Sequence, residues 1–295
     1  MSESKTVAFF GRSKDPAPAR ELLEVAGKLS AAGDTVLFSK ELSVHCESSV
    51  LKSSGVSVVE TSDVRRADFA FVLGGDGTFL RTAHHCIQQG IPLTGINLGF
   101  LGFLTDVPRE DMQRHVMEIC GGKHILEKRF VLTASVERDG KTLPMSDDSP
   151  VINDIVVSRG EAGLLLGVRV FINKTYVYDL RADGLILSTP SGSTAYALAA
   201  GGPIVAPDLR AILLVPLCAH AVTHRPLAIS LARNEIELQI TKSRSARLHL
   251  DGRVDMSLNP GDIVRVRRYA KPLRICHPMS YDYYNTLRQK LSWGS

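Results

Sequence analysis

The sequence lacks three features that would assign it to a specialised class of protein. Its five cysteines are scattered and odd in number, with no Cys-x-x-Cys pair, so they predict neither a disulfide framework nor a zinc site. No apolar run approaches the about 20 residues that a membrane-spanning helix needs, and residues 1–5 lack the apolar core of a secretory signal. We therefore expect a cytoplasmic protein with reduced thiols and no membrane partner.

The excess of positive over negative charge is also small. The formal net charge is only +4, and the basic residues are not gathered into one tail, which is too little for a protein that binds duplex nucleic acid. The same balance suits a protein that handles polyanionic small molecules. With 44% hydrophobic and 22% charged residues, the 295-residue chain has the composition of a globular protein, and its length predicts two domains.

What the chain does have is a glycine cluster directly after an apolar run. Residues 67–73 (ADFAFVL) have the composition of a buried parallel strand, and residues 78–89 have helical length, with Gly90 to end the helix. Between them, Gly74, Gly75 and Gly77 permit positive φ and a close approach of a ligand to the backbone, while amides at the start of a helix attract anions. The pattern predicts a phosphate-binding loop.

Asp76 is the unexpected residue of this loop. A carboxylate inside a phosphate site repels the ligand unless a divalent cation or a proton transfer is involved. The loop is not a Walker A motif, because no Gly-Lys-Ser/Thr follows, and it is not the dinucleotide fingerprint, because Leu80 replaces the third glycine. A glycine turn with a solvated aspartate is the alternative at this point.

The first half of the chain alternates strands with helices, which predicts an α/β domain with a Rossmann-like parallel sheet. The expected strands are residues 6–10, 36–39, 56–60, 69–73 and 91–96, and the expected helices are 16–32, 78–89 and 108–120. In this arrangement Asp76 follows the carboxyl end of a strand, where open α/β sheets bind their ligands.

The second half predicts an all-β, sandwich-like domain. Short alternating runs cover residues 130–137, 152–157, 164–172, 175–180, 228–240, 246–250 and 262–268, with turn signals such as Asp-Gly and Asn-Lys in between. The expected domains are 1–125, the α/β domain, and 126–271, the β-rich domain, followed by a tail at 272–295. The tail is amphipathic, since Leu287 and Leu291 share one helical face with Tyr284.

One helical interruption in the β-rich half is rich in hydroxyl groups. Residues 189–196 read Thr-Pro-Ser-Gly-Ser-Thr-Ala-Tyr, and residues 194–200 have helical composition with a cap at Ser191 or Ser193. Hydroxyls and amides at a helix start can bind a sugar or phosphate, and Tyr196 can stack on a heterocycle. Plain helix capping is the alternative.

Taken together, these stretches resemble the NAD kinase family over nearly the whole chain. The resemblance rests on Gly-Gly-Asp-Gly-Thr at residues 74–78, Asn153-Asp154, the stretch at 189–196 and Ala-Ala-Gly-Gly-Pro at 199–203. The Gly-Gly-Asp-Gly-Thr element is shared with phosphofructokinases and diacylglycerol-type lipid kinases, whereas the stretch at 189–196 is the specific one. The resemblance implies ATP-dependent phosphorylation of the adenosine ribose 2′-hydroxyl of NAD, a divalent metal ion, Mg²⁺, and a homodimer or homotetramer. It also implies that the β-rich domain at 126–271 binds the dinucleotide and that the tail at 272–295 returns to the first domain.

The resemblance also implies roles for individual residues. Asp76 would be the general base or would orient the 2′-hydroxyl, and Asn153 with Asp154 would contact the adenine and ribose. The phosphate loop would comprise Gly74, Gly75, Gly77 and Thr78. The residues that would bind NAD are Asp76, Gly77, Arg81, Asn153, Asp154, Arg181, Asp183, Thr194, Ala195, Tyr196, Ala199 and Arg253. Arg181 and Asp183 would come from a neighbouring loop or subunit, although such residues also commonly end a hairpin.

Three positions depart from the family pattern. Leu164 stands where some relatives carry a nucleotide-contacting histidine, Arg253 follows Asp251-Gly252 where glutamine is usual, and Ala219 replaces a proline. His220 and His224 are four residues apart but lack a carboxylate partner, so no direct protein ligand for a metal is predicted. A lipid or sugar kinase with the same loop, or a non-catalytic dinucleotide sensor, are the competing functions.

Overall fold

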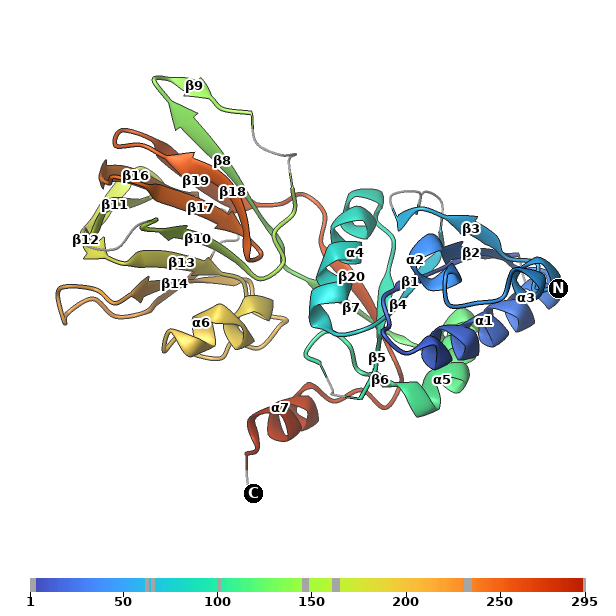
Figure 1. The fold of residues 1–295 in the computed structure, drawn as a ribbon. Coiled ribbons are helices and arrows are strands. Elements are labelled where there is room, and N and C mark those ends of the chain that lie inside the picture. Colours follow the sequence, from blue (N-terminus) through green and yellow to red (C-terminus); the bar gives the residue numbers. More distant parts are fainter. Residues whose placement is uncertain are drawn as a thin grey trace. The chain divides into compact units, whose positions relative to one another are not determined.

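The computed structural model describes residues 4–61, 64, 67–99, 102–144, 149–160, 165–230 and 235–293. The chain divides into two compact units. Unit 1 comprises Met1–Lys128 together with Leu273–Ser295, and unit 2 comprises Arg129–Pro272. Each unit contains its own sheet or sheets and its own buried core (Figure 1).

Unit 1 is built on a sheet with the strand order β3-β2-β1-β4-β5-β20-β7, to which β6 adds by pairing with β5. β1 pairs in parallel with β2 and β4, and β5 pairs in parallel with β4, β6 and β20. The strands are β1 (Thr6–Gly11), β2 (Thr35–Ser39), β3 (Ser57–Val59), β4 (Phe69–Leu73), β5 (Leu93–Asn97), β6 (Val107–Pro108), β7 (Ile125–Arg129) and β20 (Leu273–His277).

The helices of unit 1 cover both faces of this sheet, because its central strands are apolar on both sides. The helices are α1 (Pro16–Ala31), α2 (Lys40–Ser43), α3 (Ser48–Ser53), α4 (Asp76–Gln89), α5 (Met112–Cys120) after a 3₁₀ turn at Arg109–Asp111, and α7 (Tyr283–Leu291). α1 and α5 pack in one cluster with Phe9 and Phe71, and Figure 1 shows α4 on the other side of the sheet. In α7, Leu287 is buried and Lys290 Nζ lies 5.9 Å from the centre of the Phe103 ring.

Unit 2 consists of two six-stranded antiparallel sheets. One has the order β15-β14-β13-β10-β17-β18, with β10 (Asp154–Ser158), β13 (Gly184–Ser188), β14 (Ala211–Leu217), β15 (Leu227–Ser230), β17 (Ala246–Leu250) and β18 (Arg253–Leu258). The other has the order β12-β11-β16-β19-β8-β9, with β8 (Leu132–Arg138), β9 (Lys141–Thr142), β11 (Leu166–Ile172), β12 (Thr175–Ala182), β16 (Ile236–Lys242) and β19 (Ile263–Arg268).

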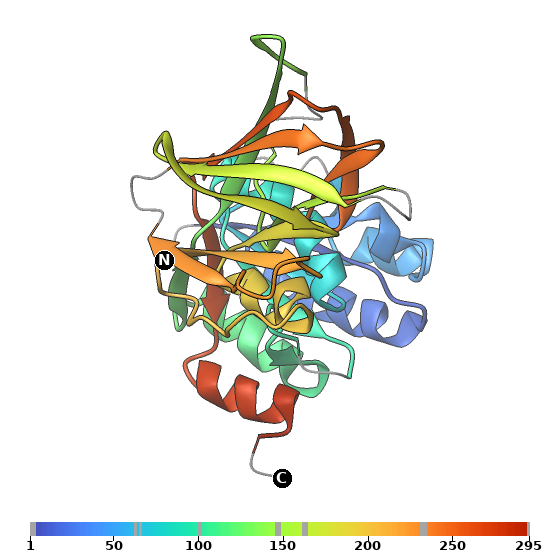
Figure 2. The same cartoon turned by 90° about the vertical axis from the view of Figure 1, so that its left-hand side faces the viewer.

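The core of unit 2 lies between these two sheets. Leu185 and Leu248 from the first sheet share one buried cluster with Val168 and Leu238 from the second. The two layers are seen from another side in Figure 2. A 3₁₀ turn at Ser191–Thr194 and the short helix α6 (Tyr196–Ala199) follow β13 and cover the outer face of the first sheet through Ala197, which packs against Ile186 and Val215.

The predicted fold class, a parallel α/β domain followed by an all-β domain, is confirmed. Three elements differ from their prediction. The helix expected at 108–120 begins only at Met112, after β6 and a 3₁₀ turn. The single strand expected at 228–240 is wrong, because β15 and β16 lie in different sheets. The helix expected at 194–200 is one helical turn preceded by a 3₁₀ turn.

Leu164, at which the family pattern is broken, lies outside the described residues, and the strand expected from residue 164 begins at Leu166. In the described part of the chain, no helix combines the length and the apolarity that crossing a membrane requires.

Candidate functional site

The loop between β4 and α4 in unit 1 forms one candidate site. Gly74 has φ +145°, and a Cβ atom there would lie 2.9 Å from the Thr78 side chain, so the tight turn requires glycine. Gly75 is the N-cap of α4, and its carbonyl accepts hydrogen bonds from the amides of Thr78 and Phe79. A Cβ at Gly77 would meet nothing within 4 Å, so the chain itself leaves open space beside this residue.

The Asp76 carboxylate is held in one orientation by a second loop. Its Oδ2 atom accepts a hydrogen bond from the Phe103 amide at 2.9 Å. Its Oδ1 atom accepts one from the Leu104 amide at 3.1 Å and one from the Thr105 hydroxyl at 3.2 Å. Since a carboxylate offers about four lone-pair positions, three donors leave roughly one for another ligand. Asp76 is therefore oriented by the protein yet still able to accept a proton or hydrogen bond.

The loop around Thr105 is shaped for this contact. A Cβ atom on Gly102 would lie 2.0 Å from Asp76 Oδ1, so only glycine lets the carboxylate approach. The buried Asn97, at the end of β5, accepts from the Gly99 amide and donates to the Thr105 carbonyl. These backbone contacts fix the donors before any ligand arrives.

A small cavity of about 170 Å³ lies beside the loop between β4 and α4. Arg81 Nη2 donates to the Thr78 hydroxyl at 3.3 Å, and Arg12, which follows β1, lines the cavity with both residues. Two guanidinium groups beside a glycine-rich helix start form an electrostatic environment suited to phosphate. The sequence alone singled out Arg81 but not Arg12.

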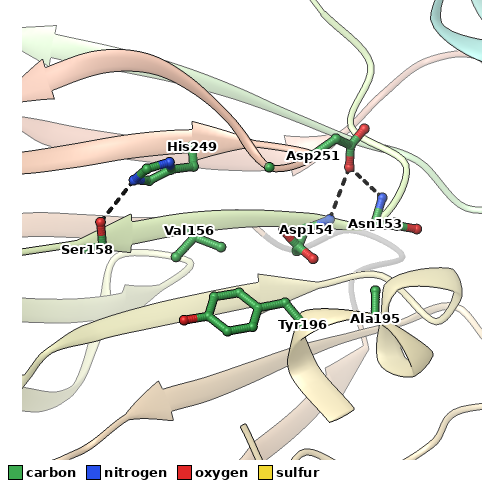
Figure 3. A pocket seen from close by; sticks show the side chains of 9 residues that line it. Asn153, Asp154, Val156, Ser158, Ala195, Tyr196, His249 and Asp251 are labelled. Carbon is green, nitrogen blue, oxygen red and sulfur yellow. Dashed lines mark hydrogen bonds between the residues drawn. The ribbon is translucent and has the colours of Figure 1, made fainter. Parts of the chain in front are cut away.

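Unit 2 contains a separate candidate site, a pocket of about 470 Å³. Its lining comprises Asn153, Asp154, Val156, Ser158, Ala195, Tyr196, His249, Asp251 and Gly252 (Figure 3). β10 and β17 form one wall, and the turn before α6 forms the other. The structure therefore brings together the predicted residues Asn153, Asp154, Ala195 and Tyr196, which come from two separate sequence motifs.

Asp251 holds the turn that carries Asn153 and Asp154. Its Oδ1 atom accepts from the Asn153 amide at 2.7 Å and from the Asp154 amide at 3.2 Å, and Oδ2 accepts from the Ile152 amide at 2.9 Å. Figure 3 shows two of these contacts as dashed lines. A carboxylate that accepts several backbone hydrogen bonds keeps such a turn in one conformation.

The hydroxyl-rich stretch is tied to the same turn. The Thr189 hydroxyl donates to the Ile152 carbonyl at 2.6 Å and accepts from the Gly192 amide at 3.0 Å. A Cβ atom on Gly192 would come within 2.1 Å of the Asn153 carbonyl oxygen. Thr189 and Gly192 therefore maintain the structure of the turn, while Ala195 and Tyr196 line the pocket.

Asp154 differs electrostatically from an ordinary surface aspartate. It is 5% exposed, and burial, with a further contribution from the charge of Asp251, raises the pKa of its carboxyl to about 7. Its carboxylate accepts no hydrogen bond from any of the described residues. Near neutral pH it can therefore either donate or accept a hydrogen bond to a ligand.

The other end of the pocket carries residues that sequence patterns did not reveal. His249 Nε2 lies 3.0 Å from the Ser158 hydroxyl, and burial together with the Arg247 charge lowers the pKa of this imidazole. Tyr196 is 49% exposed, and its ring extends along the pocket toward Ser158 (Figure 3). An exposed aromatic ring beside apolar Val156 offers a flat surface on which a heterocycle can stack.

Several predicted residues do not line this pocket. Thr194 donates its hydroxyl to the Ser191 carbonyl, and Ala199 is exposed on α6. Arg253 is exposed at the start of β18. Arg181 lines another cavity, of about 520 Å³, with Arg169 and Lys242, while Asp183 forms an ion pair with Arg159 at 3.1 Å.

Sequence reasoning missed Gly102, Thr105, Asp251, Ser158 and His249. Gly102 and Thr105 lie in a glycine-punctuated apolar segment that could have indicated a pocket wall, and Asp251 precedes a glycine in a turn. No local pattern could have paired Asp251 with Asn153, because 98 residues separate them. The contact exists only because β10 and β17 are neighbours in the sheet.

Two family models match the chain. The model of the ATP-NAD kinase N-terminal domain matches residues 20–124, and that of the ATP-NAD kinase C-terminal domain matches residues 152–277. The first match includes the Asp76 loop, and the second includes the whole pocket of unit 2.

Similar proteins agree with these matches. The NAD kinase of Chromobacterium violaceum is 42% identical over 291 residues, which cover 98% of this chain and 97% of that protein. The NAD kinase of Neisseria meningitidis serogroup C is 45% identical over 241 residues, which cover 81% of this chain and 80% of that protein.

Solved structures share the fold. Yeast NADH kinase complexed with NADH has a TM-score of 0.88 at 24% identity and covers 100% of this chain and 89% of its own. An NAD kinase from Archaeoglobus fulgidus in complex with ATP has a TM-score of 0.75 at 21% identity and covers 98% of this chain and 100% of its own. On the family models and on the sequence identity to curated relatives, this chain belongs to the NAD kinase family.

Proposed function

We propose that this enzyme transfers the γ-phosphoryl group of ATP to the 2′-hydroxyl of the adenosine ribose of NAD and so forms NADP. The observation that carries the proposal is the unit 2 pocket, in which an amide, a carboxyl group with a pKa of about 7 and an exposed tyrosine ring converge. These groups match the hydrogen-bonding edge, the hydroxyls and the flat ring of a nucleoside. Membership of the NAD kinase family supports the same reaction.

Asp76 is the residue to which we assign the chemistry. Phosphoryl transfer passes through a loose transition state, so the attacking hydroxyl needs orientation more than strong deprotonation. Three donors hold the Asp76 carboxylate and leave roughly one acceptor position for the 2′-hydroxyl. Asp76 then acts as general base by accepting the proton as the oxygen–phosphorus bond forms and the bond to the leaving ADP breaks.

We assign dinucleotide binding to the Asn153–Asp154 pair and to the stretch at 189–196. Asn153 and Asp154 contact the adenine and ribose edges, and the Tyr196 ring stacks on the ligand beside Ala195. Gly77, Thr78 and Arg81, with the additional Arg12, bind phosphate oxygens. Because Asp251 holds the Asn153–Asp154 turn through its backbone amides, Asp251 is a positioning residue.

A divalent cation, Mg²⁺ in our proposal, would be held mainly by the phosphates of the nucleotide. The described residues contain no group of three His, Cys, Asp or Glu side chains that could hold a metal ion. A site in which the nucleotide phosphates supply most of the ligands fits Mg²⁺, which commonly binds through one or two carboxylates and substrate phosphates. When bound, the ion would neutralise charge on the phosphates, and Asp76 is the one carboxylate in the loop at residues 74–78.

A homodimer or homotetramer completes the proposal. Arg181 is exposed and lines a cavity that shares none of its lining residues with the pocket of Asn153. In an oligomer, Arg181 and Asp183 of one subunit would complete the dinucleotide site of another. Size-exclusion chromatography with light scattering tests this point, and a monomer at assay concentrations would contradict it.

The reaction is tested with purified protein, ATP and Mg²⁺ in separate assays with NAD, NADH, diacylglycerol or fructose 6-phosphate as acceptor. We expect formation of NADP from NAD and no product from the lipid or the sugar. Turnover of the lipid or the sugar without turnover of NAD or NADH would assign the protein to another kinase class. Dinucleotide binding without any phosphorylation, in the presence of ATP and metal, would indicate a sensor.

A further inference from the structure

A second large cavity lies at the opposite edge of the unit 1 sheet from Asp76. Its volume is about 700 Å³, within the range of ligand pockets. It is lined by residues at or next to the amino ends of four strands: Lys5 at β1, Phe69 at β4, Pro92 at β5 and Arg274 at β20. Since the Asp76 loop follows the carboxyl end of β4, this cavity is separate from the proposed catalytic loop.

Arg274 has a guanidinium group that is only partly satisfied. Its Nη1 atom donates to the carbonyl of Gly90, the C-cap of α4, at 2.9 Å. Its Nε atom is buried without a hydrogen-bond partner, and Nη2 has none among the described residues. Because Nε is buried, Nη2 is the donor that remains for a carboxylate or phosphate in the cavity.

Two further nitrogen groups line the cavity. Lys5 Nζ donates to the Cys120 carbonyl and lies 5.8 Å from the centre of the Phe69 ring, which leaves N–H groups of the ammonium for a ligand. His124 Nδ1 lies 3.3 Å from the Ile119 carbonyl, which can only accept, so Nδ1 carries hydrogen and Nε2 has no partner in the described structure. The opposing charge is Asp68, whose Oδ2 accepts from the Thr6 amide.

The rest of the lining combines the polar residues Ser4 and Gln89 with an apolar wall. Phe69, Ile91, Pro92 and Leu126 border the cavity, and the Phe69 ring meets the His124 ring edge to face at 5.6 Å. Two permanent cations against one carboxylate favour an anion, and the apolar walls favour a ligand with an unsolvated body. We propose that this cavity binds a small molecule in which one phosphate or carboxylate group is attached to an aromatic or aliphatic body.

The test uses three probes that differ in one feature: phenyl phosphate, benzoate and phenol. Binding to the full-length protein is measured by calorimetry at constant ionic strength. We expect saturable binding of phenyl phosphate, of benzoate or of both, and none of phenol, because the oxyanion is required. The member of the pair that binds more tightly identifies the anionic group that the site prefers.

Variants assign the binding to this cavity. Arg274→Gln and Lys5→Met should each raise the dissociation constant at least about tenfold, whereas Arg114→Gln, which removes an exposed arginine on α5, should bind like the wild type. If Arg274→Gln does not fold, Lys5→Met decides the matter. The proposal is overturned if the wild type binds neither anion, or if folded variants bind as tightly as the wild type. The outcome is independent of NAD kinase activity.

Discussion

The two units present their key aspartates in opposite ways. In unit 1, the Asp76 carboxylate accepts three hydrogen bonds from a neighbouring loop. In unit 2, the Asp154 carboxylate accepts none from the described residues, is nearly buried and lies beside another carboxylate. The protein therefore supplies most of the hydrogen-bond donors that Asp76 can accept from, whereas the hydrogen bonds of the Asp154 carboxyl group are left to a ligand.

This contrast indicates that Asp76 and Asp154 have different functions. Three donors hold Asp76 in one orientation, as a group that positions a reacting hydroxyl must be held. Burial without partners raises the pKa of Asp154 to about 7. A buried carboxyl group without partners in the protein suits ligand recognition, because a hydroxyl or amino group of the ligand supplies the hydrogen bond that the protein does not provide.

The largest effect should follow from Asp76→Asn. An amide cannot accept from both the Phe103 amide and the Leu104–Thr105 donors, because one of its two ends is itself a donor. We expect NADP formation to fall by about 10²–10⁴-fold, the range for loss of a general base. Circular dichroism serves as the folding control. A folded variant with a rate near that of the wild type would move the base role away from Asp76.

Gly102→Ala should affect the same group from a distance. The new methyl would lie 2.0 Å from Asp76 Oδ1 and must displace the carboxylate. A displacement of about 1 Å can cost about 10²-fold in rate, so we expect a loss of that order in kcat. Gly27→Ala in α1 is the matched control, because its Cβ would meet only ordinary contacts at 3.6 Å. Equal activity of the two variants would show that the loop does not position Asp76.

Asp154 should make NAD binding depend on pH. Below a pKa of about 7 its carboxyl is protonated, so one oxygen becomes a donor and the negative charge that strengthens hydrogen bonds from the ligand is lost. For one group of that pKa, the ionised fraction falls about tenfold between pH 8 and pH 6, and we expect the KM for NAD to rise accordingly. Asp154→Asn should show a flatter profile across this range. An equally steep profile in the variant would assign the ionisation to another group.

The same pKa shift has a consequence for stability. Burial raises the pKa of Asp154 from 3.8 to about 7, so the folded protein holds this proton more tightly than the unfolded chain. Its contribution to the free energy of unfolding is full below about pH 4 and is lost as the pH rises toward about 7. Melting temperatures of wild type and Asp154→Asn, compared at pH 5 and pH 8, should therefore differ in favour of the variant at the higher pH. No change in that difference would contradict the shift.

The smallest effect is expected from Tyr196→Ala. A stacking contact is worth about 1 kcal/mol at a site as exposed as this one, which corresponds to about a fivefold rise in the KM for NAD. The KM for ATP should change less. Tyr284→Ala, which removes another exposed tyrosine on α7, is the control. A larger effect on ATP than on NAD would mean that the two nucleotides have exchanged places in our proposal.

Local patterns were sufficient for much of the fold. The apolar run before the glycines predicted β4 at residues 69–73, and the structure places β4 at Phe69–Leu73. They were insufficient for residues 228–240, where alternation looks the same for one strand as for two strands in different sheets. They also gave no sign that β20 joins the sheet of unit 1, because a short apolar strand does not encode its partner.

The sequence by itself determined which residues could carry the chemistry: the glycines around Asp76, the Asn153–Asp154 pair and the stretch that ends in Tyr196. Glycine permissiveness, capping and side-chain chemistry are local properties, so they can be read from neighbouring residues. Only the tertiary structure decided which partners these residues have. Thr105 reaches Asp76 across 29 positions and Asp251 reaches Asn153 across 98. Burial and hydrogen bonding between distant segments set the charge state and orientation of a side chain, and these depend on how strands pair and which loops meet.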